Sequence, residues 1–192
     1  MVAEDLAGLL RRHGVLLEGH FRLASGRHSD RYFEKFRILE HPELCRAFAR
    51  HLADRFRDAG ATVVCGPTTG GVIIAYEVAR QLGCRCIIAE PAGQGRRIGR
   101  GVVLGKTDRV LVVDDVMTTG GSVVDTLAAL EELPGEVVGV GVFIDRSGGR
   151  HRVDREVFGV YRQEVATYDP ADCPLCADGQ PLTTPGRSSK NG

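Results

Sequence analysis

Short apolar runs alternate along this chain with segments in which hydrophobic residues recur every three or four positions. The run Val110–Val113 is wholly apolar, as is typical of a strand buried on both faces of a parallel sheet. Similar patterns predict strands at Val63–Cys65, Cys84–Ala89 and Val137–Ile144, and helices at Ala3–His13, Pro42–Ala59, Val72–Leu82 and from Val123 onward. Strands that alternate with helices predict an α/β fold, with a central, mostly parallel sheet flanked by helices and joined by right-handed crossovers.

Three segments fall outside this alternation. Gly19–Phe33 is strand-like but broken by a turn at Ser25 and Gly26, so we expect a hairpin there. Glu90–Gly105 is rich in Gly and Arg and has no hydrophobic period, so we expect a long polar loop, which in a compact domain is usually functional or disordered. Tyr168–Gly186 is loop-like, and we expect the polar tail at 187–192 to be disordered.

Length and charge narrow the class of protein. With 192 residues the chain is most simply one domain, which we place at 1–186. Its 25 basic and 25 acidic residues cancel, which argues against a nucleic-acid or anionic-membrane partner. No segment approaches the roughly 20 apolar residues of a membrane span, and the N-terminus lacks a signal-peptide pattern. We therefore expect a cytoplasmic protein without a membrane or nucleic-acid partner.

The six cysteines of a cytoplasmic protein are expected to be reduced thiols. Four lie in apolar or strand-like surroundings and are predicted to be small core residues, namely Cys45, Cys65, Cys84 and Cys86. Cys173 and Cys176 form a Cys-Pro-Leu-Cys motif, which has the spacing of half a zinc site or of a redox pair. Because structural zinc needs four ligands and no second ligand pair stands nearby, we expect no metal at this motif and leave its role open.

The clearest candidate chemistry follows the apolar run at 110–113. Asp114 and Asp115 end this predicted strand, and open α/β sheets bind their ligands at the carboxyl ends of strands. Thr118–Ser122 then supply hydroxyls, flexible glycines and backbone N–H groups ahead of a helix whose dipole favours an anion. Two carboxylates repel a bare anion but hold sugar hydroxyls or a metal well. The combination predicts a site for a ribose 5-phosphate.

The segment Val112–Val123 resembles the phosphoribosyl pyrophosphate (PRPP) signature of the type I phosphoribosyltransferase family. The resemblance implies that Asp114 and Asp115 bind the ribose hydroxyls of PRPP. It implies that the 5-phosphate is bound by Thr118, Thr119, Gly120, Gly121 and Ser122. The cofactor would be Mg²⁺, held mainly by PRPP, with water-mediated contacts from the two aspartates.

Two further loops match the family by position. Gly66–Gly71 lies between a predicted strand and a predicted helix and resembles the family's pyrophosphate loop, a packing turn being the alternative. The pyrophosphate-binding candidates are Thr68, Thr69, Gly70 and Gly71. Glu90–Gly105 resembles the mobile catalytic loop, with Arg96, Arg97 and Arg100 as its cations. Members of the family usually carry a lysine and often a histidine in that loop, whereas Pro91–Gly105 contains neither.

Two segments resemble the orotate-using members of the family. In these members a Phe-x-Leu-x-Ser-Gly hairpin and a Tyr/Phe pair form part of a hood over the base, here at Phe21, Leu23, Ser25, Gly26, Tyr32 and Phe33. The hood would span about 14–40 and part of the C-terminal region. Some members carry a substrate-touching lysine where this chain has Ala24, and Arg27 is a candidate replacement.

Asp145-Arg146 matches the strand end whose arginine binds orotate in the family. A planar guanidinium can pair bidentately with a carboxylate, a group that purines and uracil lack; a surface arginine is the alternative. The resemblance thus gives the orotate-binding residues as Arg146, Thr118, Tyr32 and Phe33.

The resemblance implies an enzyme that transfers the 5-phosphoribosyl group from PRPP to orotate. The products would be orotidine 5′-monophosphate and pyrophosphate, in de novo pyrimidine (UMP) biosynthesis. The resemblance also implies a homodimer in which the mobile loop reaches the neighbouring site. Two alternatives stay open: a type I transferase for a purine or uracil, and a non-catalytic regulator of the same fold that binds PRPP as a signal.

Overall fold

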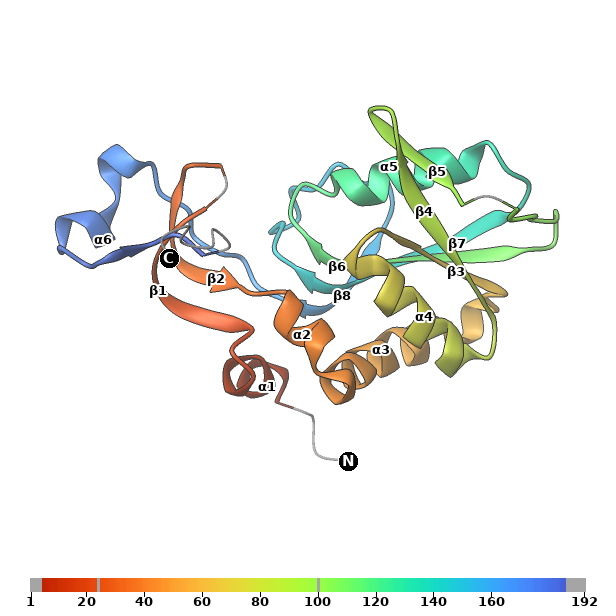
Figure 1. Cartoon of the computed structure of the whole chain (residues 1–192), viewed down its shortest axis with the longest axis horizontal. Coiled ribbons are helices and arrows are strands. Elements are labelled where there is room, and N and C mark those ends of the chain that lie inside the picture. The colour runs from red at the N-terminus through yellow and green to blue at the C-terminus, as the bar shows by residue number, and fades with distance from the viewer. Residues whose placement is uncertain (1–4, 24, 100, 186–192) are drawn as a thin grey trace, which may run out of the picture. The chain divides into compact units, whose positions relative to one another are not determined.

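The computed structural model describes residues 5–23, 25–99 and 101–185, and the chain divides into two compact units (Figure 1). Unit 1 comprises Met1–Ile38 and Glu164–Gly192, and unit 2 comprises Leu39–Gln163. Unit 1 therefore draws on both ends of the sequence. The short helix α2 (Phe36–Glu40) spans the point at which the chain passes from unit 1 to unit 2.

Unit 2 is built on a six-stranded sheet with the strand order β5-β4-β3-β6-β7-β8. Five strands run parallel: β3 (Val63–Pro67), β4 (Arg85–Ala92), β6 (Arg109–Met117), β7 (Glu136–Asp145) and β8 (Val157–Arg162). The edge strand β5 (Gly95–Ile98) pairs antiparallel with β4. The predicted α/β class and mostly parallel sheet are thus confirmed.

Helices cover both faces of this sheet (Figure 1). α3 (Pro42–Phe56), which continues as the 3₁₀ turn Arg57–Ala59, and α4 (Gly70–Leu82) lie on one face, and α5 (Gly121–Glu131) lies on the other. Alternate strand residues point to opposite faces, so Val140 and Val142 join the cluster packed under α5, whereas Gly141 faces α3. No helix in the described ranges is long and apolar enough to cross a membrane.

Unit 1 contains a three-stranded sheet with the order β2-β1-β9. The predicted hairpin is confirmed: β1 (Leu16–Arg22) and β2 (His28–Phe33) pair antiparallel, and β1 begins three residues before the predicted start. β9 (Leu182–Thr183) pairs parallel with β1 and so joins the C-terminal segment to the hairpin. The remaining short elements of unit 1 are α1 (Leu6–Arg12), the 3₁₀ turn η2 (Pro170–Asp172) and α6 (Pro174–Ala177).

The hairpin turn is also tied to the C-terminal segment through a side chain. Arg27 donates hydrogen bonds to the hydroxyl of Thr167 at 3.1 Å and to its carbonyl oxygen at 2.8 Å. The guanidinium considered as a replacement for a substrate-binding lysine therefore has a structural contact within unit 1.

Two loop predictions are corrected by the structure. Glu90–Gly105 is not one loop, because β4 runs to Ala92 and turns through Gly93 into β5. This edge hairpin has one charged cross-strand pair, Glu90 with Arg97, and a second arginine opposite Pro91, so it lacks the apolar alternation that identifies strands. Tyr168–Gly186 contains η2, α6 and β9, while the predicted tail at 187–192 lies outside the described residues.

The cysteines predicted for the core are of two kinds. Cys45 and Cys65 are buried, as predicted, whereas Cys84 and Cys86 are half-buried. Burial is the largest cause that raises the pKa of Cys45 to about 11 and that of Cys65 to about 12. Both therefore stay protonated at neutral pH and are core side chains, although Cys65 lies just ahead of the loop after β3.

Candidate active site

The strand order of unit 2 reverses between β3 and β6. From β3 the chain passes through α4 to β4 on one side, whereas β6 pairs with the other side of β3. Ligand sites of open α/β sheets lie at the carboxyl ends of the strands where the order reverses. The two loops at this point are Thr68–Thr69, which leads from β3 into α4, and Thr118–Gly120, which leads from β6 into α5. The two glycine loops predicted from the sequence thus meet at one edge of the sheet.

Asp114 and Asp115 are buried near the end of β6, with 7% and 6% of their surfaces exposed. The strand runs to Met117, beyond the predicted end at Val113, so both acids lie within it. Oδ1 of Asp114 accepts the backbone N–H of Asp115 at 2.8 Å, and Oδ1 of Asp115 accepts that of Val116 at 2.6 Å. These local hydrogen bonds fix the orientation of both carboxylates.

The first residues of α4 lie against the acid pair. A Cβ on Gly70 would stand 2.0 Å from Oδ2 of Asp115, and one on Gly71 would stand 3.0 Å from Oδ1 of Asp114 and 2.6 Å from Cδ of Pro67. Only residues without a side chain fit here. The positive end of the α4 dipole therefore faces the carboxylates and offsets part of the free energy required to bury them.

The loop after β6 has the form predicted for an anion cradle. Thr118 and Thr119 are exposed, and Gly120 precedes α5 in the left-handed conformation with φ of 80°. The backbone N–H of Arg152, in the segment after β7, donates a hydrogen bond to the carbonyl oxygen of Thr119 at 2.9 Å. No side chain caps the N-terminus of α5, where Gly121 and Ser122 begin the first turn, so its backbone N–H groups suit an anionic ligand.

The arginines of the β4–β5 hairpin have different surroundings. Arg96 donates to the carbonyl oxygens of Ala89 at 3.0 Å and Thr68 at 3.2 Å, and to the Thr68 hydroxyl at 3.3 Å. It therefore brings a positive charge to the loop after β3, where the peptide bond between Thr68 and Thr69 is cis. Arg97 instead pairs with Glu90 at 3.1 Å. Arg100, the third predicted cation, lies outside the described residues.

Arg146 follows β7, which pairs with β6 such that Asp145 lies opposite Met117. Its backbone N–H donates to the carbonyl of Met117 at 2.9 Å, which fixes the residue beside the end of β6. The buried carboxylate of Asp145 accepts the N–H of Ser147 at 2.9 Å and its hydroxyl at 2.6 Å. Ser147 was not predicted to take part in this turn, although an Asp at a strand end commonly accepts the backbone N–H two residues on.

The remaining predicted orotate-binding residues belong to unit 1. Tyr32 and Phe33 lie on β2, where Phe33 is buried and the ring of Tyr32 lies 5.8 Å from that of Phe21. Their role in binding a base stays a prediction.

The class of protein follows from comparison with known families. Residues 36–171 match the phosphoribosyl transferase domain. The chain is 42% identical over 186 residues to the orotate phosphoribosyltransferase of Desulforamulus reducens, covering 97% of both chains. It is 40% identical over 189 residues to that of Chlorobaculum parvum, covering 98% of both. The chain therefore belongs to the orotate phosphoribosyltransferase family.

A solved structure agrees with this assignment. The crystal structure of orotate phosphoribosyltransferase from Aeropyrum pernix matches with a TM-score of 0.71 and 28% identity. The match covers 82% of this chain and 93% of that one. The fold identified from the strand order and the family identified from the sequence thus coincide.

The contact between α4 and the acid pair predicts the effect of one substitution. Gly70→Ala should lower the free energy of unfolding by about 1–3 kcal/mol, because the added methyl group overlaps the Asp115 carboxylate. Without this overlap the substitution would be expected to stabilise the helix, because alanine is more favourable than glycine in a helix by about 1 kcal/mol. Urea unfolding measures the difference. Gly95→Ala is the control, since a Cβ on Gly95 meets no atom within 4 Å. A Gly70→Ala variant as stable as wild type would contradict this packing.

Proposed function

We propose that this protein transfers the 5-phosphoribosyl group of PRPP to orotate, giving orotidine 5′-monophosphate and pyrophosphate for pyrimidine synthesis. Family membership supports the reaction, and one observation supports its location. Gly70 and Gly71 approach Asp114 and Asp115 so closely that the loop after β3, the acid pair and the loop after β6 form one continuous edge. PRPP has three parts in the same order: a pyrophosphate, a ribose and a 5-phosphate.

Each part of this edge then has a role. Thr68, Thr69, Gly70 and Gly71 would bind the pyrophosphate, and Thr118, Thr119, Gly120, Gly121 and Ser122 would bind the 5-phosphate. Asp114 and Asp115 would accept hydrogen bonds from the ribose hydroxyls, which carboxylates do well. Fixed at both ends, the sugar presents its reacting carbon in one orientation, and such positioning supplies much of the rate of a transfer reaction.

Charge separates during the reaction, and the proposed site has a cation beside the position of the leaving group. As pyrophosphate leaves, positive charge develops on the ribosyl group and negative charge on the departing anion. The guanidinium of Arg96 lies against Thr68, beside the proposed pyrophosphate site, and would stabilise the leaving group in the transition state. Orotate is already an anion, so no strong general base is required.

The donor set also fits Mg²⁺. Carboxylate oxygens are hard ligands, and Mg²⁺ usually keeps several waters while it binds substrate phosphates and one or two carboxylates. Asp114 and Asp115 would hold such an ion through water, and the ion would neutralise pyrophosphate charge when bound. The homodimer, the single-domain organisation with its hood and the cytoplasmic location stay predictions.

Selection of orotate is assigned to Arg146. Its guanidinium offers a planar pair of donors to the orotate carboxylate, and the turn set by Asp145 and Ser147 holds its backbone at the end of β7. Arg146→Ala should raise KM for orotate about 10- to 100-fold, the effect of losing a charge-assisted hydrogen bond of about 1.5–3 kcal/mol. KM for PRPP should change little. Loss of orotate absorbance in the presence of PRPP and Mg²⁺ measures both constants.

Arg150→Ala is the matched control, because Arg150 is an exposed arginine of the same turn. Parallel reactions with uracil, hypoxanthine and adenine test the base. Turnover of one of those bases in place of orotate would contradict the proposed specificity. If no base reacts while PRPP still binds, the protein is a non-catalytic regulator and the proposed enzyme activity is wrong.

The two described hairpin arginines should differ in their effect on kcat. Arg96→Ala should lower kcat by about 100-fold, as loss of a transition-state hydrogen-bond donor commonly does. Arg97→Ala should have a much smaller effect, since Arg97 is exposed and pairs with Glu90. Pre-steady-state measurement of pyrophosphate release isolates the chemical step. Equal losses in the two variants would show that Arg96 has no special position.

A further inference from the structure

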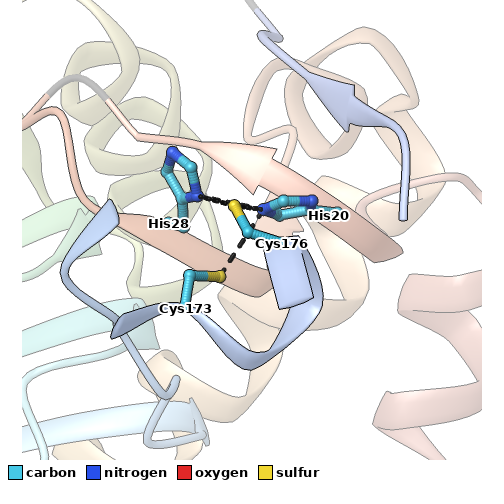
Figure 2. A group of neighbouring side chains, drawn as sticks. All are labelled: His20, His28, Cys173 and Cys176. Atoms are coloured by element: carbon cyan, nitrogen blue, oxygen red, sulfur yellow. Dashed lines mark hydrogen bonds between the residues drawn. The ribbon is translucent and has the colours of Figure 1, made fainter. Parts of the chain in front are cut away.

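Four side chains of unit 1 with metal-binding atoms converge on one point (Figure 2). His20 and His28 come from the β1–β2 hairpin, and Cys173 and Cys176 come from the segment around α6. The hairpin register pairs Arg22 with His28 and shifts between Glu18 and Phe21, so His20 lies in an irregular stretch of β1. The hydrogen bond between the two rings places His20 against His28. Three of the four residues are buried, and Cys176 is exposed.

The separations of the ligand atoms are close to those of a tetrahedral zinc site. With bonds of about 2.0 Å to nitrogen and about 2.3 Å to sulfur, the ligand atoms of such a site lie about 3.3–3.8 Å apart. Nε2 of His20 lies 3.0 Å from Nδ1 of His28, 3.6 Å from Sγ of Cys173 and 3.7 Å from Sγ of Cys176. Sγ of Cys176 lies 3.3 Å from Nδ1 of His28, and all four ligand atoms are within 4.8 Å of one another.

Hydrogen bonding alone does not account for this convergence. Nδ1 of His20 lies 2.8 Å from the carbonyl oxygen of Gln180, which can only accept, so Nδ1 carries the proton. In the neutral ring, Nε2 then has a single lone pair, yet three polar atoms surround it. A cation at the centre would bind all four groups at once. The bond to Gln180 is the outer contact that fixes the tautomer of a metal-bound histidine.

We propose that His20, His28, Cys173 and Cys176 bind one structural zinc ion. Two thiolates and two neutral imidazoles suit zinc, and their charge balances that of Zn²⁺, which lowers the free energy of burying it. Four protein ligands leave no position for a substrate, so the ion is structural. The expectation that the Cys-Pro-Leu-Cys motif lacks a second ligand pair is wrong, because His20 and His28 supply it. The histidine–cysteine contacts of the cluster join residues that are 148 to 156 positions apart in the sequence.

A zinc ion would also stabilise the fold of unit 1. Its sheet has three strands, and the backbone pairing between the hairpin and the C-terminal segment consists of the two-residue β9 and an isolated bridge between His28 and Tyr168. Small units with small cores commonly depend on a metal or a disulfide for stability. The zinc ion would add a metal-mediated link between these two distant parts of the chain to the few hydrogen bonds that join them.

Metal analysis of the full-length protein tests the proposal. Protein purified without chelators should contain one zinc ion per chain, as measured by inductively coupled plasma mass spectrometry. After removal of zinc, titration with Co²⁺ should give the visible bands of tetrahedral cobalt and a near-ultraviolet thiolate charge-transfer band that saturates at one equivalent. Removal of zinc should lower the thermal unfolding midpoint of the wild type. No stoichiometric metal, or cobalt spectra without the thiolate band, would overturn the site.

Cys176→Ser distinguishes the site from nonspecific thiol binding. The exposed position of Cys176 makes it the ligand easiest to replace. This variant should lose at least half of the charge-transfer intensity, and zinc removal should no longer shift its unfolding midpoint. Cys84→Ser, a half-buried cysteine of unit 2, should behave as the wild type. Equal spectra for the two variants, or a Cys173–Cys176 disulfide in the purified wild-type protein, would refute the proposal.

Discussion

The burial of two carboxylates at the centre of a parallel sheet is the constraint on which the rest of unit 2 depends. Asp114 and Asp115 are almost wholly removed from water, and an uncompensated buried charge is strongly destabilising. Their compensation comes from adjacent backbone N–H groups and from the N-terminus of α4. That helix can approach closely enough only because it begins with two glycines. The close approach of the helix to the carboxylates thus restricts the first two residues of α4 to glycine.

The same arrangement organises the chemistry. Because β3 and β6 are adjacent and parallel, their loops meet at one edge, and the acid pair lies where a sugar between two phosphates would lie. The guanidinium of Arg96 reaches this edge from the β4–β5 hairpin, and the backbone of Arg146 is fixed beside the end of β6.

The sequence was informative wherever local chemistry determines structure. Buried strands such as Val110–Val113 show as apolar runs, and the glycine loops show by composition. The β4–β5 hairpin was missed because its cross-strand pair, Glu90 with Arg97, is polar on an exposed edge. The cluster of His20 and His28 with Cys173 and Cys176 was missed for another reason. Its members are adjacent only after the C-terminal segment pairs with the hairpin, and no local sequence pattern indicates a contact across most of the chain.

The central claim is that the acid pair and its two loops form one PRPP site, and calorimetric titration of PRPP with Mg²⁺ tests it most directly. The measurement needs no base and no turnover. Asp114→Asn combined with Asp115→Asn keeps the shape but removes the charge, so PRPP should bind about 10- to 100-fold more weakly than to the wild type, as expected for lost charge-assisted hydrogen bonds. Equal affinity of wild type and double variant would contradict the account.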